Sequence, residues 1–276
     1  MSESAANGSL LEVESLSKFF DGVPAVEDVS FEVRRSETLG IVGESGSGKT
    51  TLVRAILRAI DPDRGIVRFN SSTGWVELQD MTPKELIPLR REMQMIFQDP
   101  FASLNPRMTV REILEEPLII HRVGSATQRL EAVRDMLAHV QLEEDSLTRY
   151  PHAFSGGQRQ RIGIARALIL RPNLVVCDES VSALDVSVQA QIINLLEELQ
   201  NELGLTYLFV AHDLSVVQHI CDRVLVMHRG RVVESGTVDE IFETPKEPYT
   251  RLLLSAVPSP DPDVPLKPLD RSELGL

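Results

Sequence analysis

The sequence predicts an α/β fold, and three patterns in it carry that prediction. A glycine-rich run at 43–50 stands between a short apolar segment, 38–42, and a segment with helical character, 49–60. Two later apolar segments, 174–179 and 208–213, end in polar residues, as expected of strands buried on both faces of a sheet. Segments of alternating polarity indicate further strands. We therefore expect a core of buried strands and helices with a second β layer beside it.

The alternating segments are the first expected elements. Residues 10–16 and 29–33 alternate enough to form strands, and 66–69 and 75–78 add two more around a Ser-Ser-Thr-Gly turn. Together they predict an antiparallel β layer.

The glycine-rich run fits the pattern Gly-x4-Gly-Lys-Ser/Thr of a phosphate-binding P-loop without a mismatch. Residues 38–42 predict a buried strand before it, and 49–60 predict a helix after it, closed by Asp61-Pro62. Glycines let backbone N–H groups surround an anion, and the helix dipole adds to the attraction. Lys49 can supply a full charge to the β- and γ-phosphates, and Thr50 a hydroxyl ligand for Mg²⁺. The flanking strand and helix disfavour the alternative, a glycine-rich surface turn.

The apolar run 174–179 ends in two carboxylates, Asp178 and Glu179. In a nucleotide-hydrolysing site, Asp178 would hold Mg²⁺ through water, and Glu179 would polarise the attacking water beside the γ-phosphate. A strand that ends in acids is common, so this Walker B prediction depends on the P-loop.

After residue 109 the periodicity becomes helical. Five apolar residues recur at helical spacing after the polar segment 125–128. They are Leu130, Val133, Met136, Leu137 and Val140. We therefore expect a helical subdomain over about 101–154, with this stripe as its core.

Composition and charge limit the classes of function. With 276 residues and 42% hydrophobic content, the chain can bury a substantial core as one elaborated domain. Its net charge of −13 argues against a broad nucleic-acid-binding surface, although a local basic patch remains open. No apolar stretch approaches the roughly 18 residues of a membrane-spanning helix, and the polar start lacks a signal-peptide pattern. We expect a membrane role only through partners.

Both cysteines are expected to be buried structural thiols. Cys177 falls inside the apolar run, and Cys221 on the apolar face of a predicted helix.

Several strings together resemble ABC transporter ATPases. The run 154–158, Phe-Ser-Gly-Gly-Gln, is typical of them, and the strings 97–110, 150–161 and 248–258 resemble the oligopeptide/dipeptide permease subfamily. The resemblance covers about 10–262. It implies a P-loop NTPase core of ABC ATPase type with an antiparallel β subdomain, an inserted helical subdomain and a short C-terminal extension.

The resemblance divides a single domain, 1–276, into three parts. The nucleotide-binding core covers about 8–97 and 160–235, the helical subdomain about 98–159, and the C-terminal extension about 236–276.

The resemblance also assigns site residues. Glu179, His212 and Gln98 are implied to be catalytic, and Thr50, Gln98 and Asp178 to hold Mg²⁺. The residues implied to bind ATP are Phe20, Gly43, Ser45, Gly46, Ser47, Gly48, Lys49, Thr50, Thr51, Asp178, Ser155, Gly156, Gly157, Gln158 and Asp185. Phe20 would stack on adenine, and its rival Phe19 is expected to pack inward. The remaining histidines, among them His228, are expected to be structural.

The helix that Ser155 opens presents N–H groups and a hydroxyl but has no phosphate of its own. In ABC ATPases two cassettes dimerise head to tail, so that segment 155–158 of one closes on the γ-phosphate held by the other. Hydrolysis then removes the γ-phosphate contacts and opens the dimer.

Three features depart from the family pattern. Ser180 stands where proline is usual after Glu179, and we expect activity to survive this change. Glu247 replaces a common histidine without an evident catalytic consequence. The chain ends at Leu276, before the cysteine-containing segment of many relatives, so we expect no iron–sulfur cluster.

The expected function is that of the ATPase subunit of an importer for oligopeptides, dipeptides or a related solute, on the cytoplasmic face of the membrane. Its implied partners are a second ABC ATPase subunit, identical or related, permease subunits and, indirectly, a substrate-binding protein. No nucleic acid is expected. Phe101, Leu104 and Asn105 are candidates for a groove that receives a permease helix. The alternative is a soluble ABC ATPase of an enzyme complex such as carbon–phosphorus lyase.

Overall fold

The computed structural model describes residues 8–99 and 103–256, which form two compact units. The first contains the described chain up to Asp80 and from Leu208 onward, and the second runs from Met81 to Tyr207. The expected division into core, helical subdomain and C-terminal extension uses other boundaries and stays a prediction. Phe101, one of the groove candidates, lies outside the described residues.

A four-stranded sheet belongs to the first unit. Its order is β2-β1-β4-β5, and all neighbouring strands are antiparallel. The strands are β1 (Ser9–Phe20), β2 (Val23–Arg34), β4 (Arg64–Ser71) and β5 (Gly74–Glu77). Alternation places buried residues opposite one another, so that Leu11 faces Phe69 and Val13 faces Val67. The predicted antiparallel layer is confirmed.

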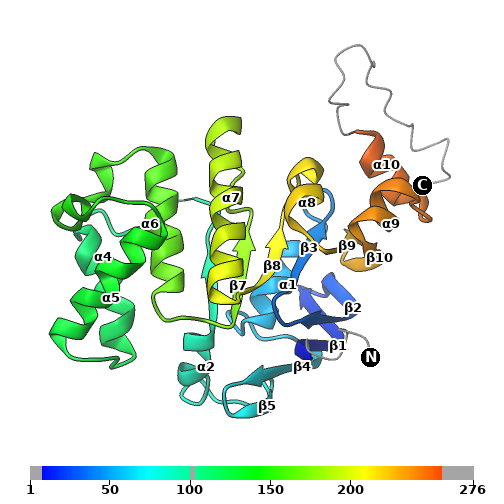
Figure 1. Ribbon diagram of the computed structural model, residues 1–276. Coiled ribbons are helices and arrows are strands. Elements are labelled where there is room, and N and C mark those ends of the chain that lie inside the picture. The colour runs from blue at the N-terminus through cyan, green and yellow to red at the C-terminus, as the bar shows by residue number, and fades with distance from the viewer. Residues whose placement is uncertain (1–7, 100–102, 257–276) are drawn as a thin grey trace, which may run out of the picture. The chain divides into compact units, whose positions relative to one another are not determined.

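A second set of strands in this unit carries the glycine-rich loop. Their order is β10-β9-β3-β8, and β3 runs parallel to β9. The strands are β3 (Thr38–Val42), β8 (Thr206–Val210), which enters the unit at Leu208, β9 (Arg223–His228) and β10 (Arg231–Thr237). Every residue of β3 is buried, as its apolar sequence predicts. The helices of the unit are α1 (Lys49–Ile56), α8 (Leu214–Ile220), α9 (Val238–Glu243) and α10 (Pro248–Ser255) (Figure 1).

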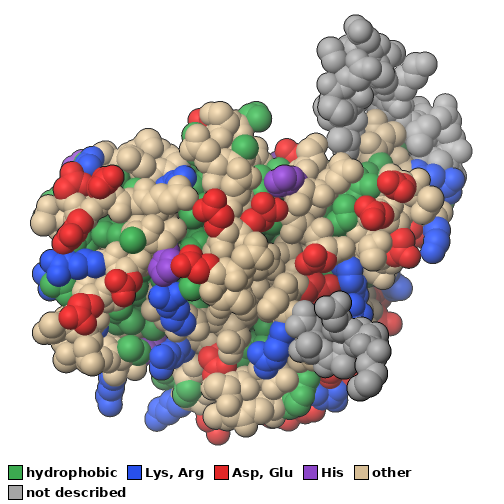
Figure 2. Space-filling view, viewed as in Figure 1, with side chains coloured by type: hydrophobic (Ala, Val, Ile, Leu, Met, Phe, Trp, Pro, Cys, Tyr) green, Lys and Arg blue, Asp and Glu red, His purple; other side chains and the backbone are tan. Residues whose placement is uncertain are grey.

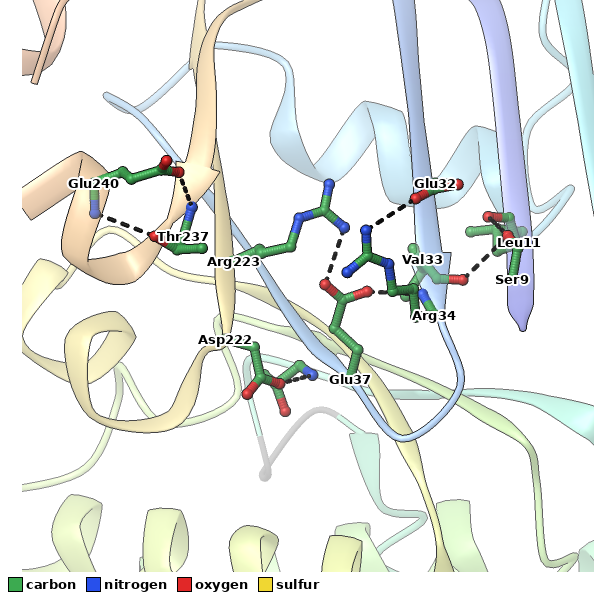
Figure 3. Close-up of polar contacts among 11 residues, drawn as sticks. Ser9, Leu11, Glu32, Val33, Arg34, Glu37, Asp222, Arg223, Thr237 and Glu240 are labelled. Atoms are coloured by element: carbon green, nitrogen blue, oxygen red, sulfur yellow. Dashed lines mark hydrogen bonds and ion pairs between the residues drawn. The ribbon is translucent and has the colours of Figure 1, made fainter. Parts of the chain in front are cut away.

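Buried polar contacts hold the start of β3 (Figure 3). Glu37, 6% exposed, accepts the Arg34 N–H at 2.7 Å and an Arg223 guanidinium N–H at 3.0 Å. The Thr38 N–H donates to the Asp222 carboxylate at 2.8 Å, and the Asp222 N–H returns a bond to the Thr38 carbonyl at 2.9 Å. These bonds join β2, β3 and β9 at the end of β3 opposite the glycine-rich loop.

The second unit pairs two short parallel strands and surrounds them with helices. The strands are β6 (Met93–Ile96) and β7 (Leu174–Asp178). The helices are α2 (Leu86–Glu92), α4 (Val110–Ile120), α5 (Ala126–His139), the 3-10 turns η2 (Glu144–Thr148) and η3 (Pro151–Ala153), α6 (Gly156–Leu168) and α7 (Val186–Leu203). Figure 1 shows α4, α5 and α6 gathered together, in agreement with their mutual contacts.

Side-chain caps explain where these helices begin. The side chains of Thr109, Ser125 and Ser155 each accept the backbone N–H of the residue three positions later. The side chain of that later residue accepts the backbone N–H of the capping residue in return. On α5 the buried residues are Val133, Met136 and Leu137, all from the predicted stripe. The helical character predicted after residue 109 is confirmed.

Two local predictions are wrong. The helix predicted over 49–60 ends at Ile56, because Arg58 adopts a left-handed conformation with φ 52° and its guanidinium turns to the Gln79 carbonyl at 2.7 Å. Cys221 is buried as expected but is not helical, because α8 ends one residue earlier and Cys221 is extended. A Cβ at Gly40 would lie 2.9 Å from its sulfur, so Cys221 packs tightly on the β3 backbone.

The surface carries charges of both signs. Figure 2 shows basic and acidic side chains interspersed over the face that it draws. Within the ranges that the structure describes, no helix combines the length and the apolar character needed to span a bilayer.

Candidate functional site

The glycine-rich loop between β3 and α1 depends on close backbone contacts. A Cβ at Gly43 would lie 2.2 Å from the Met227 carbonyl oxygen, and one at Gly48 would lie 2.2 Å from the Ala25 carbonyl oxygen. Gly48 also takes a positive φ of 104° as the residue before α1. Both positions therefore require glycine, because a side chain would collide with these carbonyl oxygens.

Lys49 and Ser47 point their polar atoms into this loop. The Lys49 ammonium, on a side chain only 5% exposed, donates to the carbonyls of Gly43 at 2.8 Å and Glu44 at 2.9 Å. The Ser47 hydroxyl is buried and has no hydrogen-bond partner among the described residues. These two groups suit a bound polyphosphate. Its oxygens would accept hydrogen bonds from the Lys49 ammonium and from the Ser47 hydroxyl beside the glycine-rich loop.

The turn between β9 and β10 braces the loop from the side. The Gly230 N–H donates to the Ser47 carbonyl at 2.9 Å, and the Gly230 carbonyl accepts the Glu27 N–H at 2.8 Å. An open cleft of about 110 Å³ lies there, lined by Glu44, Ser45, Gly46, Ser47, His228 and Arg229. His228 therefore lines the cleft beside the P-loop. From the sequence we expected a structural histidine and did not predict this location.

Two further candidates of the first unit stand in exposed positions. The Ala211 N–H donates to the Ile41 carbonyl at 3.2 Å, so the exposed His212 follows β8 beside the end of β3. Phe20 ends β1 with half of its surface exposed, whereas Phe19 is half-buried with the Arg64 guanidinium 5.7 Å from its ring centroid. Exposure favours Phe20 for stacking, but the choice stays a prediction.

Parallel pairing in the second unit brings the candidate catalytic carboxylate to the candidate glutamine. Ile96 of β6 is opposite Cys177 of β7, so Gln98 and Glu179 each stand two residues beyond a matched pair. The Gln98 side-chain amide donates to the Glu179 carboxylate at 2.7 Å. Asp178, the residue before, is 5% exposed.

Glu179 has an unusual backbone conformation. Its φ of 49° lies in the left-handed region, which costs a non-glycine residue of order 1 kcal/mol or more. Ser182 supports the turn, because its N–H donates to the Glu179 carbonyl at 3.1 Å and its hydroxyl donates to the same oxygen at 2.9 Å. Ser180, between them, is 2% exposed.

The run 155–158 opens α6 and packs on the start of α7. Ser155 is exposed, and its hydroxyl accepts the Gln158 N–H at 3.3 Å. A Cβ at Gly157 would lie 2.5 Å from a methyl of Val188, so this glycine permits close contact with α7. Asp185 caps α7 by accepting the Val188 N–H at 2.9 Å, and this bond lowers the pKa of the Asp185 carboxyl.

The residues expected to hold Mg²⁺ each carry an oxygen donor. Among the described residues, no cluster of three or more His, Cys, Asp or Glu side chains could hold a metal by itself. Mg²⁺ in ATPases takes one or two protein oxygens together with phosphates and water. Thr50, in the first unit, and Asp178, in the second, each carry an oxygen of that kind.

Sequence reasoning did not find the residues that brace the loop. Besides His228 and Gly230, Tyr249 of α10 contacts the P-loop backbone, because its hydroxyl accepts the Glu44 N–H at 3.1 Å. Tyr249 lies within the string 248–258, which supported the subfamily resemblance but was not assigned a place near the P-loop.

Comparison with protein families matches two parts of the chain. Residues 26–182 match the family model described as ABC transporter, and residues 233–273 match that described as oligopeptide/dipeptide transporter, C-terminal region.

Relatives cover most of the chain. The oligopeptide transport ATP-binding protein OppF of Streptococcus mutans is 52% identical over 92% of this chain and 83% of its own length. That of Bacillus subtilis is 51% identical over 92% of this chain and 84% of its own.

Solved structures agree with these matches. The structure of cbiO1 from Clostridium perfringens, part of the ABC transporter complex cbiONQ, has a TM-score of 0.77 at 29% identity and covers 86% of this chain and 91% of that one. A dimeric ATP-binding cassette in a post-hydrolysis state bound to ADP and Pi has a TM-score of 0.73 at 29% identity, covering 83% and 99% of the two chains. The chain therefore belongs to the ABC transporter family and is an ABC ATPase.

Proposed function

We propose that this ABC ATPase drives the import of oligopeptides, dipeptides or a related solute through a membrane permease. Its match to an oligopeptide/dipeptide transporter C-terminal region supports this role, as does its likeness to proteins named for oligopeptide transport. The observation that carries hydrolysis is the bond between Gln98 and Glu179, because it holds a carboxylate and an amide together where a water could be oriented.

ATP binding would use the loop of the first unit. The N–H groups of 45–50 would surround the phosphates, the buried Ser47 hydroxyl would donate to one of them, and Lys49 would exchange its carbonyl partners for phosphate oxygens. Phe20 would stack on adenine. Thr50, Asp178 and Gln98 would contribute oxygen ligands to Mg²⁺, which neutralises charge on the phosphates when bound.

Hydrolysis would depend on Glu179 as general base. The Gln98 amide orients its carboxylate, and the left-handed turn closed by Ser182 sets the direction in which the side chain leaves β7. A water bonded to this carboxylate would pass a proton to it while its oxygen bonds to the γ-phosphorus. The bond from that phosphorus to the β–γ bridging oxygen would break, leaving ADP and inorganic phosphate. His212 would contact the γ-phosphate and sense its loss.

A second cassette would complete each site. The N-terminus of α6 is exposed at Ser155 and offers amides and a hydroxyl to an anion. In a head-to-tail pair, this end would close on the γ-phosphate held by the partner, and hydrolysis would release it. Permease subunits on the membrane would convert closing and opening into transport, with the ATPase at the cytoplasmic face.

Isolation of the native assembly tests this function. The Glu179→Gln protein is trapped with Mg-ATP in gently solubilised membranes, and every chain that accompanies it is identified. We expect permease subunits and a second ATPase. Recovery of a soluble enzyme complex without membrane chains, such as one that cleaves carbon–phosphorus bonds, would overturn the importer role and leave the ATPase intact.

A further inference from the structure

Helix α10 reaches the P-loop through one tyrosine. Tyr249 is 3% exposed, and its ring stacks on that of His228 with centroids 3.9 Å apart and planes 10° from parallel. Its hydroxyl accepts the Glu44 N–H at 3.1 Å. An element near the end of the described chain therefore bonds to the first turn of the loop.

The amide that Tyr249 contacts also holds the P-loop lysine. The Glu44 N–H and the Gly43 carbonyl belong to one planar peptide group and point in opposite directions. Lys49 donates to that carbonyl at 2.8 Å on one side, while the tyrosine hydroxyl accepts the N–H on the other. Donation at one end of an amide strengthens acceptance at the other.

The bond from Tyr249 limits the rotation of this peptide group. Gly43 has no side chain to limit rotation of the following peptide, and Glu44 is exposed. Rotation would turn the Gly43 carbonyl away from the Lys49 ammonium. The Tyr249 hydroxyl opposes it, because the same rotation would break the bond from Glu44.

The start of α10 is itself anchored. Glu234 of β10 accepts the Lys246 N–H at 2.7 Å and the Glu247 N–H at 3.2 Å, just before the helix begins. Burial raises the pKa of Glu234, but Thr250 and these two N–H groups lower it by more, so the net shift is downward. A charged carboxylate thus fixes the end of α10 that carries Tyr249.

We propose that Tyr249 is a positioning residue for ATP binding, which holds the Gly43–Glu44 peptide and through it the Lys49 ammonium in place for the β- and γ-phosphates. The proposal rests on the P-loop function proposed above. It gives the C-terminal region of this chain a direct influence on nucleotide affinity.

Tyr249→Phe in the full-length chain isolates the hydroxyl, because the ring and its stack on His228 remain. Binding of trinitrophenyl-ATP and trinitrophenyl-AMP is measured by fluorescence. We expect affinity for the triphosphate to fall about five-fold, since one hydrogen bond is lost, while affinity for the monophosphate stays within about two-fold. A purely structural role for Tyr249 would weaken both ligands equally.

Tyr207→Phe is the matched control. The Tyr207 hydroxyl is also buried and donates to the Leu196 carbonyl at 3.0 Å, but both residues belong to the second unit, whereas the P-loop belongs to the first. Its loss should lower the melting temperature without changing either affinity.

Two outcomes overturn the positioning role: unchanged triphosphate affinity in Tyr249→Phe, or equal loss for both ligands. Lys49→Ala distinguishes a failure of the Tyr249 proposal from a failure of the proposed P-loop function. If Lys49→Ala binds the triphosphate like wild type, the P-loop assignment fails. If it weakens binding and Tyr249→Phe does not, only the role of Tyr249 fails.

Discussion

Glu179 is held by its neighbours at two points, the side-chain carboxylate and the backbone carbonyl oxygen. Gln98 bonds its side chain, and Ser182 bonds its carbonyl oxygen twice, which stabilises a left-handed conformation that glycine would adopt more easily. The residue is therefore oriented before substrate arrives, which supports its proposed role as general base.

Glu179→Gln should retain ATP binding and lose turnover. The glutamine carbonyl can still accept the Gln98 amide, so the local geometry is kept, but the side chain can no longer take a proton. We expect steady-state hydrolysis to fall at least about 100-fold, with ATP affinity within about two-fold of wild type. Phosphate release and nucleotide binding are measured on the same preparation, with the exposed Glu131→Gln on α5 as control. Undiminished hydrolysis would remove Glu179 from this role.

Cys177 should make stability depend on pH above neutrality. Complete burial raises the pKa of its thiol from 9.0 to about 12. Because the unfolded thiol ionises first, this stability is fully present below about pH 9 and is lost as the pH rises towards 12. Between pH 7 and pH 10, wild type should lose about 1.5 kcal/mol more unfolding free energy than Cys177→Ala. Urea unfolding at both values measures this, and equal losses would contradict it.

At the scale of elements, the start of β3 depends on one buried carboxylate. Glu37→Ala removes the carboxylate that accepts hydrogen bonds from the Arg34 N–H and the Arg223 guanidinium (Figure 3). Both donors are partly buried and would lose this acceptor. We expect a loss of about 2 kcal/mol in the free energy of unfolding, measured with urea.

Glu32→Ala is the control for that variant. Its pair with Arg34 is 3.4 Å long, and both side chains are about half exposed. Exposed pairs contribute little, so a loss below about 0.5 kcal/mol is expected. Similar losses in the two variants would contradict the assignment of the buried network as the support of β3.

Local sequence signals predicted the strands of the antiparallel layer, the strand before the P-loop and the helical region after residue 109. Residues 38–42 alone gave the bounds of β3, because five apolar or small residues before a glycine-rich turn suit a buried strand. Ser155 was predicted to open a helix, and it caps α6 with a bond that forms within one turn. Thr109 and Ser125 cap α4 and α5 with bonds of the same kind, which were not predicted. The end of α1 was missed, since the bond that turns Arg58 away goes to Gln79, 21 residues later.

At the scale of the whole molecule, ATP should join two copies or two related cassettes. The Glu179→Gln chain should be monomeric without nucleotide and dimeric with Mg-ATP, measured by light scattering after size exclusion. Adding Ser155→Asp should abolish the dimer, because aspartate still caps α6 but places a negative charge against the γ-phosphate.

The melting temperature of the double variant serves as its control. It should equal that of Glu179→Gln, since serine and aspartate cap a helix about equally well. A dimer that persists with Ser155→Asp would show that the start of α6 does not meet the phosphate.

The sequence by itself determined that the chain is an ABC ATPase, because a phosphate loop, acids after an apolar strand and a glycine-rich helix start are local patterns. It also determined the antiparallel layer through alternating polarity. Only the tertiary structure decided what supports these residues. The register of β6 and β7 brings Gln98 to Glu179, and α10 brings Tyr249 to Glu44, across 81 and 205 residues of chain. Such contacts arise from pairing between distant segments, whose partners no local pattern names.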